Sequence, residues 1–443
     1  MSLTTPLTVR TLQAALHAKA KGAPSFRFYS LYDKVYRRDV LEHAYRRCRQ
    51  NAGAPGIDGQ TFADIDAQGV AGWLDALAKD LREGTYQPAP IRRVFIPKPD
   101  GKQRPLGIAT IRDRVAQMAV VLVLEAIFEA DLQPEQYAYR PKRDAHGALR
   151  RVHELVNTGY RQVVDADLSG YFDSIPHPEL LRSVARRVSD GRLLALIKAW
   201  LETPVEERTG RGTVSRTTRN RDERQGTPQG SPLSPLLSSI YFRRFILGWK
   251  SRGHAERFSA HIVNYADDFV ICCRGNAEQA LAAMRTLMTR LKLTVNESKT
   301  RTCRLPADTF DFLGYTIGIC RRPRTGTRYL GSRPSAKRVS RIKREISDMT
   351  ARRRSLVATE VQVMQLNRVL RGWSNYFSLG AVSAAYRAVD YHVRARLRRW
   401  LCVKHNVGNG GSTQFPDQYL YNELRLVKLC DGTRASRVRL RDS

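Results

Sequence analysis

Apolar residues recur every three or four positions in several stretches of the chain, a spacing that places them on one face of an amphipathic helix. The four stripes are Val40, Leu41, Ala44, Tyr45 and Cys48; Val339, Ile342, Ile346 and Met349; Leu366, Val369, Leu370, Trp373 and Phe377; and Val393, Leu397, Trp400 and Leu401. Residues 114–132 are apolar almost throughout, so we predict a helix buried in a core there. Residues 1–39 show only a weak pattern, and we predict no element for them.

Other stretches are short, rich in β-branched residues and bounded by turn residues, as strands are. Residues 91–109 form a predicted hairpin, with its turn at Pro99-Asp100-Gly101. Residues 161–167 (RQVVDAD) and 262–273 (IVNYADDFVICC) look like central strands of one sheet, and the second is two apolar runs that meet at a pair of aspartates. Residues 204–224 are polar and basic, which predicts an exposed hairpin.

A shift in composition near residues 325–335 indicates a domain boundary. Residues 321–354 hold thirteen basic residues and two acidic ones, while the helical apolar stripe continues. We therefore expect four parts: an N-terminal extension at 1–90, a sheet-containing domain at 91–325, a helical domain at 326–400, and a basic C-terminal extension at 401–443 that is a candidate DNA-binding segment.

The charge of the chain points to a polyanionic partner. Lysine and arginine number 75 against 42 acidic residues, a formal net charge of +33. The uncharged apolar run at 115–124 is too short to span a bilayer, and the N-terminus lacks a signal-peptide pattern, so we expect a cytoplasmic protein that makes no membrane contact. Seven scattered cysteines without a C-x-x-C pair argue against disulfides and zinc.

Asp267 and Asp268 are the first candidates for catalytic chemistry, because they lie where two strand-like runs meet. A third acid at the end of the other strand would complete a set of hard oxygen ligands, which select Mg²⁺. Asp165 and Asp167 both fit, since side chains on a strand repeat every two residues. Three carboxylates that hold two Mg²⁺ ions would support nucleotidyl transfer. The alternative is a solvated turn, which is the usual setting of an isolated aspartate pair.

Eight motifs resemble, in their order along the chain, the conserved blocks of reverse transcriptases, in particular the bacterial group II intron-encoded type. They are NAGAPGIDG, IPKPDGKQRPLGI, DADLSGYFDSIPH, QGTPQGSPLSPLLSSIYF, YADD, LTVNESKT, DFLGY and the maturase-like LNRVLRGWSNYF. The resemblance implies an α/β (α+β) right-hand polymerase, with fingers and palm built on an antiparallel sheet and then an α-helical thumb or maturase domain. It also implies an RNA-directed DNA polymerase with two Mg²⁺ ions, deoxynucleoside triphosphates as substrates, a group II intron RNA template and a DNA primer or target. Nothing after Cys402 resembles the paired cysteines and histidines of the family's endonuclease module.

The resemblance also assigns roles to single residues. Asp167, rather than Asp165, corresponds to the third catalytic acid and metal ligand beside Asp267 and Asp268. The substrate-binding residues it implies are Lys98 and Arg104 on the incoming triphosphate, Phe172 as the steric gate against a ribose 2′-hydroxyl, and Gln229 in the nucleotide pocket, where Gly230 lets the backbone come close. A buried core position is the alternative for Phe172, and a solvated face the alternative for the two basic residues.

Further correspondences concern nucleic acid. Phe312, Leu313 and Gly314 match the primer grip, Arg140 lies in a template-covering block, and Lys299 is either a nucleic-acid contact or structural. Arg371, Trp373 and Tyr376 are expected to bind RNA, with the alternative that Trp373 and Phe377 belong to the core and only arginines reach phosphate. Arg394, Arg398 and Arg399 suit a helix that tracks a duplex.

Two other functions stay open at this point. One is a splicing cofactor with an idle polymerase site, which the presence of all three acids argues against. The other is a domesticated relative in DNA repair or phage defence, which only the flanking DNA separates from an intron-borne protein.

Overall fold

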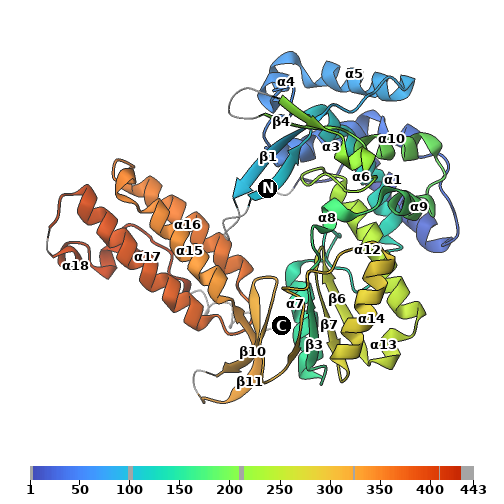
Figure 1. Ribbon diagram of the computed structural model, residues 1–443. Coiled ribbons are helices and arrows are strands. Elements are labelled where there is room, and N and C mark those ends of the chain that lie inside the picture. Colours follow the sequence, from blue (N-terminus) through green and yellow to red (C-terminus); the bar gives the residue numbers. More distant parts are fainter. Residues whose placement is uncertain (1–2, 98–102, 209–213, 323–324, 409, 431–443) are drawn as a thin grey trace. The chain divides into compact units, whose positions relative to one another are not determined.

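The computed structural model describes residues 3–97, 103–208, 214–322, 325–408 and 410–430 (Figure 1). Its contacts divide the chain into two compact units. Unit 1 comprises Met1–Ala148 and Val164–Arg301, and unit 2 comprises Leu149–Val163 and Thr302–Ser443. The four-part division expected from composition stays a prediction.

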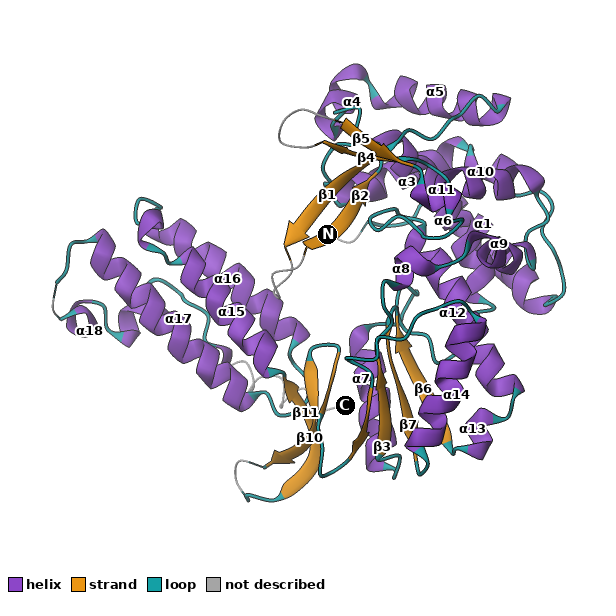
Figure 2. Ribbon diagram, in the orientation of Figure 1, coloured by secondary structure: helices purple, strands orange, loops and turns teal. Residues whose placement is uncertain are grey.

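Unit 1 is a mainly helical body with two sheets (Figure 2). The helices within it are α1 (Leu7–Gly22), α2 (Tyr32–Val35), α3 (Arg38–Gln50), α4 (Phe62–Gln68), α5 (Val70–Glu83), α6 (Ile111–Glu129), α8 (Tyr171–Ser174), α9 (His177–Ala185), α10 (Gly191–Leu201), α11 (Arg219–Asp222), α12 (Ser234–Ser251), α13 (His254–Arg257) and α14 (Ala277–Arg290). Helix α7 (Ala145–Asn157) crosses from unit 1 into unit 2.

Helix α6 is the centre of the core of unit 1. It begins after Thr110, whose side chain accepts a hydrogen bond from the backbone N–H of Asp113 and so caps the helix. Nearly all of its residues are buried, and it packs against α1 and α3. A helix that is apolar on all sides, as α6 is, is expected to be buried on all sides. The predicted core helix is therefore confirmed, with bounds at Ile111–Glu129, and the stripe of residues 40–48 is confirmed as the buried face of α3.

Helix α1 was not predicted from the sequence. Its buried residues are only Val9, Leu16 and Ala20, so the apolar stripe is diluted by polar positions. The helix is stabilised instead by its neighbours. Arg187 donates from Nη2 to the carbonyl of Ala20 at 2.5 Å and from Nη1 to that of Ala23 at 3.0 Å, which satisfies carbonyls at the end of the helix.

The first sheet of unit 1 has the strand order β2-β1-β4-β5. Its strands are β1 (Ile91–Pro97), β2 (Gln103–Ile108), β4 (Val205–Arg208) and β5 (Val214–Thr217). β1 and β2 pair antiparallel, which confirms the predicted hairpin, although its turn lies outside the described residues. The second predicted hairpin is confirmed as the pair β4–β5, and β4 also pairs with β1 in parallel, so it extends the sheet.

The second sheet of unit 1 contains β6 (Ala260–Tyr265) and, next to it, β7 (Asp268–Cys273). The two strands pair antiparallel from Ala260 opposite Cys273 to Tyr265 opposite Asp268. β3 (Gln162–Ala166) lies next to β7 and ends immediately before Asp167. The central strands expected at residues 161–167 and 262–273 are thus confirmed, and α14 packs on β7.

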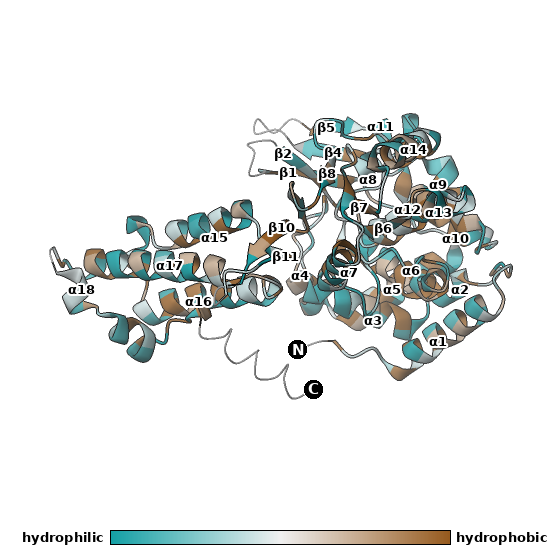
Figure 3. Ribbon diagram, turned by 90° about the horizontal axis from the view of Figure 1, so that it is seen from below, coloured by the Kyte–Doolittle hydropathy of each residue, from teal (hydrophilic) through white to brown (hydrophobic). Residues whose placement is uncertain are grey.

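Unit 2 combines a small sheet with a helical bundle. Besides β8 (Arg301–Arg304), it contains β9 (Phe310–Phe312), β10 (Tyr315–Arg321) and β11 (Arg328–Pro334), then α15 (Ala336–Met349), η1 (Arg352–Arg354), α16 (Thr359–Tyr376), α17 (Ser383–Lys404), α18 (Gly411–Gln414) and the π-helical turn η2 (Tyr419–Glu423). The sheet order is β11-β10-β9, with antiparallel pairs. The three predicted helices are confirmed, and their apolar stripes form the core of the bundle. Much of α15 is coloured hydrophilic in Figure 3, as its basic composition requires.

Candidate active site

Asp267 lies in a two-residue turn between β6 and β7. Because Tyr265 pairs with Asp268, only Ala266 and Asp267 connect the strands. Ala266 has a φ of +58°, a conformation that an alanine rarely adopts. The side chain of the buried Asn264 stabilises the turn, since its Nδ2 donates to the carbonyl of Ala266 at 2.7 Å. The turn thereby holds one carboxylate at its tip and a second at the start of β7.

Asp167 is held by the segment that contains the NESKT motif. Its carboxylate oxygen Oδ2 accepts from Asn296 Nδ2 at 2.7 Å and from Lys299 Nζ at 3.2 Å. Its backbone N–H donates to Thr300 Oγ1 at 3.2 Å, and its carbonyl accepts from the N–H of Asn296 at 2.9 Å. Asp167 therefore has a defined position, with one oxygen already neutralised by an ammonium group.

The acidic residues act on one another. The pKa of Asp268 is raised to about 7 by partial desolvation of its carboxyl group and then by the negative charges of Asp267, Asp167 and Asp165, in that order, while Lys299 opposes the rise. The side chain of Asp268 keeps contact with solvent. The structure thus brings the three predicted acids into one electrostatic cluster. Asp165 belongs to the cluster too, and its Oδ2 lies 3.7 Å from Nε of Arg301.

The donor set suits Mg²⁺ chemically, because it consists of carboxylate oxygens whose repulsion a divalent cation would relieve. As they stand, no three histidine, cysteine, aspartate or glutamate side chains among the described residues are arranged to hold a metal ion. At Asp167, Lys299 Nζ lies 3.2 Å from Oδ2. The residues that would hold a metal are Asp167, Asp267 and Asp268.

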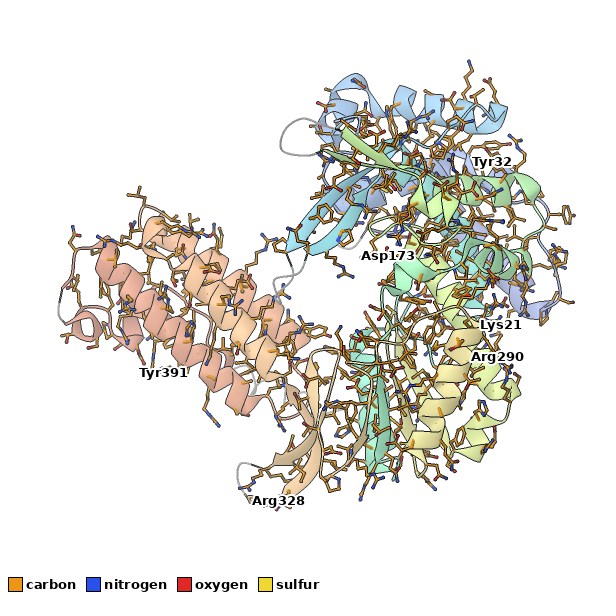
Figure 4. The ribbon with its side chains drawn as sticks, viewed as in Figure 1. Lys21, Tyr32, Asp173, Arg290, Arg328 and Tyr391 are labelled. Atoms are coloured by element: carbon orange, nitrogen blue, oxygen red, sulfur yellow. The ribbon has the colours of Figure 1, made fainter. Side chains whose placement is uncertain are left out.

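Two of the predicted substrate-binding residues form a chain of hydrogen bonds. Arg104 on β2 donates from Nε to Gln229 Oε1 at 3.2 Å, and Gln229 Nε2 donates to Asp173 Oδ2 at 3.0 Å. Asp173 lies at the end of α8 and is labelled in Figure 4. Gly230 has a φ of +111°, and a Cβ there would lie 2.5 Å from the carbonyl oxygen of Gly107, so this glycine is required by the contact with β2. Lys98 lies outside the described residues.

Phe172 sits on α8 and is partly buried against the core of unit 1. Its ring meets that of Tyr171 edge to face with centroids 5.5 Å apart. Its carbonyl accepts from the N–H of Thr227 at 2.7 Å, which joins α8 to the segment before Gln229. This position is compatible with the gate and with a packing residue, and the gate role stays a prediction.

Leu313 and Gly314 form the turn between β9 and β10 in unit 2. Phe312 pairs with Tyr315, and both turn residues have positive φ, +50° and +82°, as in a type I′ hairpin turn. Tyr376 at the end of α16 donates from its hydroxyl to the carbonyl of Leu313 at 2.9 Å. The predicted primer grip and one predicted RNA-binding residue are therefore in direct contact.

Comparisons with known proteins identify two family matches in the chain. Residues 96–317 match the family model for reverse transcriptase (RNA-dependent DNA polymerase), and residues 339–416 match the maturase-specific domain of group II introns. Protein YkfC of Escherichia coli is 33% identical over 357 residues, which cover 72% of this chain and 91% of YkfC. The chain is a reverse transcriptase.

Other relatives match in part. The group II intron-encoded protein LtrA of Lactococcus lactis is 33% identical over 235 residues, which are 52% of this chain and 37% of LtrA. Among solved structures, a partial Cas6-RT-Cas1–Cas2 complex matches with a TM-score of 0.35 and 21% identity over 58% of this chain and 42% of that one. The two family matches support RNA-directed DNA polymerase and maturase roles and imply that this reverse transcriptase binds intron RNA.

The remaining residues expected to bind RNA differ in what they contact. Arg371 is exposed, whereas Trp373 packs against Phe377 with ring centroids 4.9 Å apart. Arg394 and Arg398 both pair with Asp417, at 2.7 and 2.5 Å, and Arg399 is exposed. The core packing of Trp373 agrees with the alternative for this residue, and RNA contact by the others stays a prediction.

Arg140 has many partners within the protein. Its Nη2 pairs with Glu129 Oε1 at 2.6 Å, and its Nη1 donates to the carbonyls of Gln133 and Gln136 at 2.7 and 3.0 Å. Only 6% of the side chain is exposed. These contacts give Arg140 a structural role in the reverse transcriptase, and the proposed template contact would have to be made by the loop it organises.

Three residues of the site were not singled out from the sequence: Asn264, Asn296 and Asp173. Asn264 precedes the aspartate pair, and the two others lie inside quoted motifs, but an amide or a carboxylate in a strand or loop carries no signal of its partner. Their roles depend on contacts between segments, as in the bond from Asn296 to Asp167.

None of the helices in the described part of the chain has the length and apolar character that a membrane crossing needs.

Proposed function

We propose that this chain extends a DNA primer on an RNA template at Asp167, Asp267 and Asp268, and that it is the maturase of a group II intron. The observation that supports the site is that β3, which ends before Asp167, lies next to β7, which begins at Asp268. In agreement, the pKa of Asp268 is raised by desolvation and then by the charges of Asp267, Asp167 and Asp165. Such a cluster is costly unless cations neutralise it, and nucleotidyl transfer is the chemistry that uses two of them.

When bound, the two Mg²⁺ ions would activate the primer 3′-hydroxyl and stabilise the leaving pyrophosphate. The side chains of the chain would prepare this step. Lys299 keeps Asp167 in place until the cations arrive, and the linked Arg104, Gln229 and Asp173 orient the incoming deoxynucleoside triphosphate. A guanidinium group suits the phosphate oxygens, and fixed geometry matters because small misplacement lowers the rate steeply.

The decisive experiment compares two neighbouring acids. Asp167→Asn should abolish Mg²⁺-dependent primer extension on an RNA template, whereas Asp165→Asn should leave most of it, since only Asp167 is assigned to the metals. The double variant Asp267→Ala with Asp268→Ala should also be inactive and should bind RNA as the parent does. Full extension by Asp167→Asn or by the double variant would refute the site.

Sugar selection tests Phe172 separately. Phe172→Ala should admit ribonucleotides, because removal of the ring opens the space beside the 2′-carbon. The measurement is the ratio of ribonucleotide to deoxynucleotide incorporation, with Phe62→Ala as a partly buried aromatic control elsewhere in unit 1. An unchanged ratio in Phe172→Ala contradicts the gate.

The maturase role rests on the match at residues 339–416 and on the net charge of +33. Structured RNA is bound largely through phosphates and shape, for which such a charge is suited. Sequencing of the RNA that co-purifies with the protein tests this part. A stoichiometric group II intron is expected, and an unselective mixture of RNAs would contradict the maturase proposal without affecting the polymerase site.

A further inference from the structure

A cavity of about 410 Å³ in unit 1 has no part in the site described above. It lies between the end of α6, helix α9 and helix α12. Four arginines line it, namely Arg182, Arg186, Arg243 and Arg244. Two apolar side chains, Phe128 and Ile240, are also in the wall. The volume falls within the range of about 300–1,000 Å³ that is typical of ligand sites.

The positive charge of this arginine cavity is not balanced. Among the described residues, its one lining acid is Asp131, which lies 3.4 Å from Nε of Arg187, an arginine outside the lining. Arg243 donates from Nε to the backbone carbonyl of Asp131 at 2.7 Å rather than to a carboxylate. In the described part of the chain, Arg186 forms no salt bridge. Among the described residues, Arg186, Arg243 and Arg244 therefore lack a carboxylate partner, and only Arg182 has one nearby.

A nearby acid does not correct this imbalance. Glu179 pairs with Lys292 at 2.9 Å and lies 4.0 Å from Arg182, so its charge is already shared between two cations. Burial lowers the pKa of Arg243, and the charges of Arg186 and Arg187 lower it further, against the effect of Asp131. Guanidinium groups that are close together and partly desolvated favour an anion among them.

Helix α12 separates the arginine cavity from the catalytic segments. Ile240, Arg243 and Arg244 share one face of the helix, at spacings of three and four residues. The other face contacts the site: the carbonyl of Ser238 accepts from the hydroxyl of Tyr171 at 2.7 Å, and Phe242 packs on Phe269 with centroids 5.3 Å apart. A ligand in the cavity would thus not compete with substrate.

We propose that the arginine cavity binds the phosphodiester backbone of structured RNA, with one nucleotide in the cavity and its phosphates on Arg182 and Arg186. This inference rests on the proposed RNA partner and adds a contact site to it. RNA is favoured over a small free anion because four guanidinium forks exceed what one phosphate can engage, whereas a backbone presents phosphates in series.

The test uses charge reversal with a matched control. The cavity variant carries Arg182→Glu and Arg186→Glu, both at exposed positions. The control carries Lys79→Glu and Arg290→Glu, which are exposed, line no part of the cavity and change the net charge equally; Arg290 is labelled in Figure 4. The probe is an in vitro transcript of a bacterial group II intron, bound at several salt concentrations. Primer extension on a short RNA template is measured in parallel.

The cavity variant should bind the transcript more weakly than the control does. The slope of log affinity against log salt should fall by about one for each phosphate that the variant no longer binds. Extension of the short template should match the parent, because the variant leaves the aspartates intact. A milder pair, Arg182→Gln with Arg186→Gln, repeats the test if the reversed charges disturb folding.

Two failures are distinguishable. If the cavity variant binds the transcript with the affinity and salt slope of the control, this inference is overturned and the polymerase site is unaffected. If the parent protein does not extend a primer, the proposed function fails whatever the cavity binds. A loss of RNA affinity that is equal in the cavity variant and the control also overturns the inference, because it reflects net charge alone.

Discussion

Two tight turns of this reverse transcriptase have the same length, but one carries negative charge and the other is neutral. The turn at Ala266 and Asp267 in unit 1 and the turn at Leu313 and Gly314 in unit 2 each join two antiparallel strands. Each places a non-glycine residue at positive φ, +58° for Ala266 and +50° for Leu313. Such a conformation costs on the order of 1–3 kcal/mol and persists only where the surroundings hold it.

The two turns are held in different ways. The first is stabilised by Asn264 from its own strand and carries two carboxylates that repel each other. The second carries no charge and is held by the hydroxyl of Tyr376, from a helix within the maturase-specific match. In the first turn, two carboxylates repel each other, and a cation can relieve that repulsion. In the second turn, the bond from Tyr376 fixes the proposed primer grip relative to α16.

Loss of a carboxylate from the first turn should have the largest effect. Asp268→Asn should reduce primer extension by about a thousandfold or more, because a metal ligand is lost. The same change should stabilise the metal-free protein, on the order of 1 kcal/mol after allowance for solvent screening. A neutral amide lacks the charge that the neighbouring carboxylates repel. Thermal denaturation with and without Mg²⁺ measures this, and Mg²⁺ should stabilise the parent more than the variant.

The direction in which the unfolding free energy changes with pH follows from the raised pKa of Asp268. The group is neutral in both the folded and unfolded states below its unfolded pKa of 3.8, and it is charged in both states above about 7. Its ionisation therefore removes stability from the metal-free parent as the pH rises from about 4 to 7. The difference between Asp268→Asn and the parent should grow across this window and then level off. A difference independent of pH would contradict the proposed repulsion.

Removal of the Asn264 amide that holds the first turn should have the second-largest effect. Asn264→Ala deletes the donor to the carbonyl of Ala266 and leaves that carbonyl without its partner, at a cost of about 1–3 kcal/mol in unfolding free energy. Misplaced aspartates should lower primer extension by roughly 10²-fold, since a shift of about 1 Å is sufficient for such a loss. Asn157→Ala, at an exposed asparagine, is the control. Normal primer extension by Asn264→Ala would show that the turn keeps its conformation without the Asn264 side chain.

The apolar pattern was sufficient to infer α3, α6, α15, α16 and α17, with the clearest period in α3 and α15, and the two hairpins could be inferred from their strand and turn residues. Helix α1 could not, since it depends on Arg187, which is distant in sequence. The β9–β11 sheet was also missed, because β9 is only three residues long and the turn after it uses Leu313 where glycine or asparagine would signal a hairpin.

For the site, periodicity left Asp165 and Asp167 equivalent, and only the resemblance chose between them. The structure adds the partners of Asp167. Hydrogen bonds between segments have no sequence period, so Asn296 and Asn264 could not be inferred. The same limit applies to Arg140, whose charge suggests nucleic acid while its contacts with Glu129 are internal.

A weaker effect is expected at the second turn, where a single hydroxyl is removed. Tyr376→Phe keeps the ring and loses the bond to the carbonyl of Leu313, worth about 0.5–1.5 kcal/mol. If the turn positions the primer, the KM for primer–template should rise several-fold while kcat changes little. Tyr391→Phe, whose side chain on α17 is 68% exposed and labelled in Figure 4, should leave both constants unchanged. Equal KM values for Tyr376→Phe and the parent would show that the bond from Tyr376 on α16 has no effect on primer binding.

The smallest effect should come from relief of backbone strain at the turns. Ala266→Gly removes a Cβ from a position at positive φ and should raise the unfolding free energy by a few tenths of a kcal/mol, up to about 1. Leu313→Gly relieves similar strain but also deletes a partly buried side chain, so it should gain less or lose stability. Chemical denaturation measures both. A gain at Leu313 equal to that at Ala266 would mean that the leucine side chain adds nothing to the second turn. In that case Tyr376 alone would hold it, and Tyr376→Phe should become more damaging in the Leu313→Gly background.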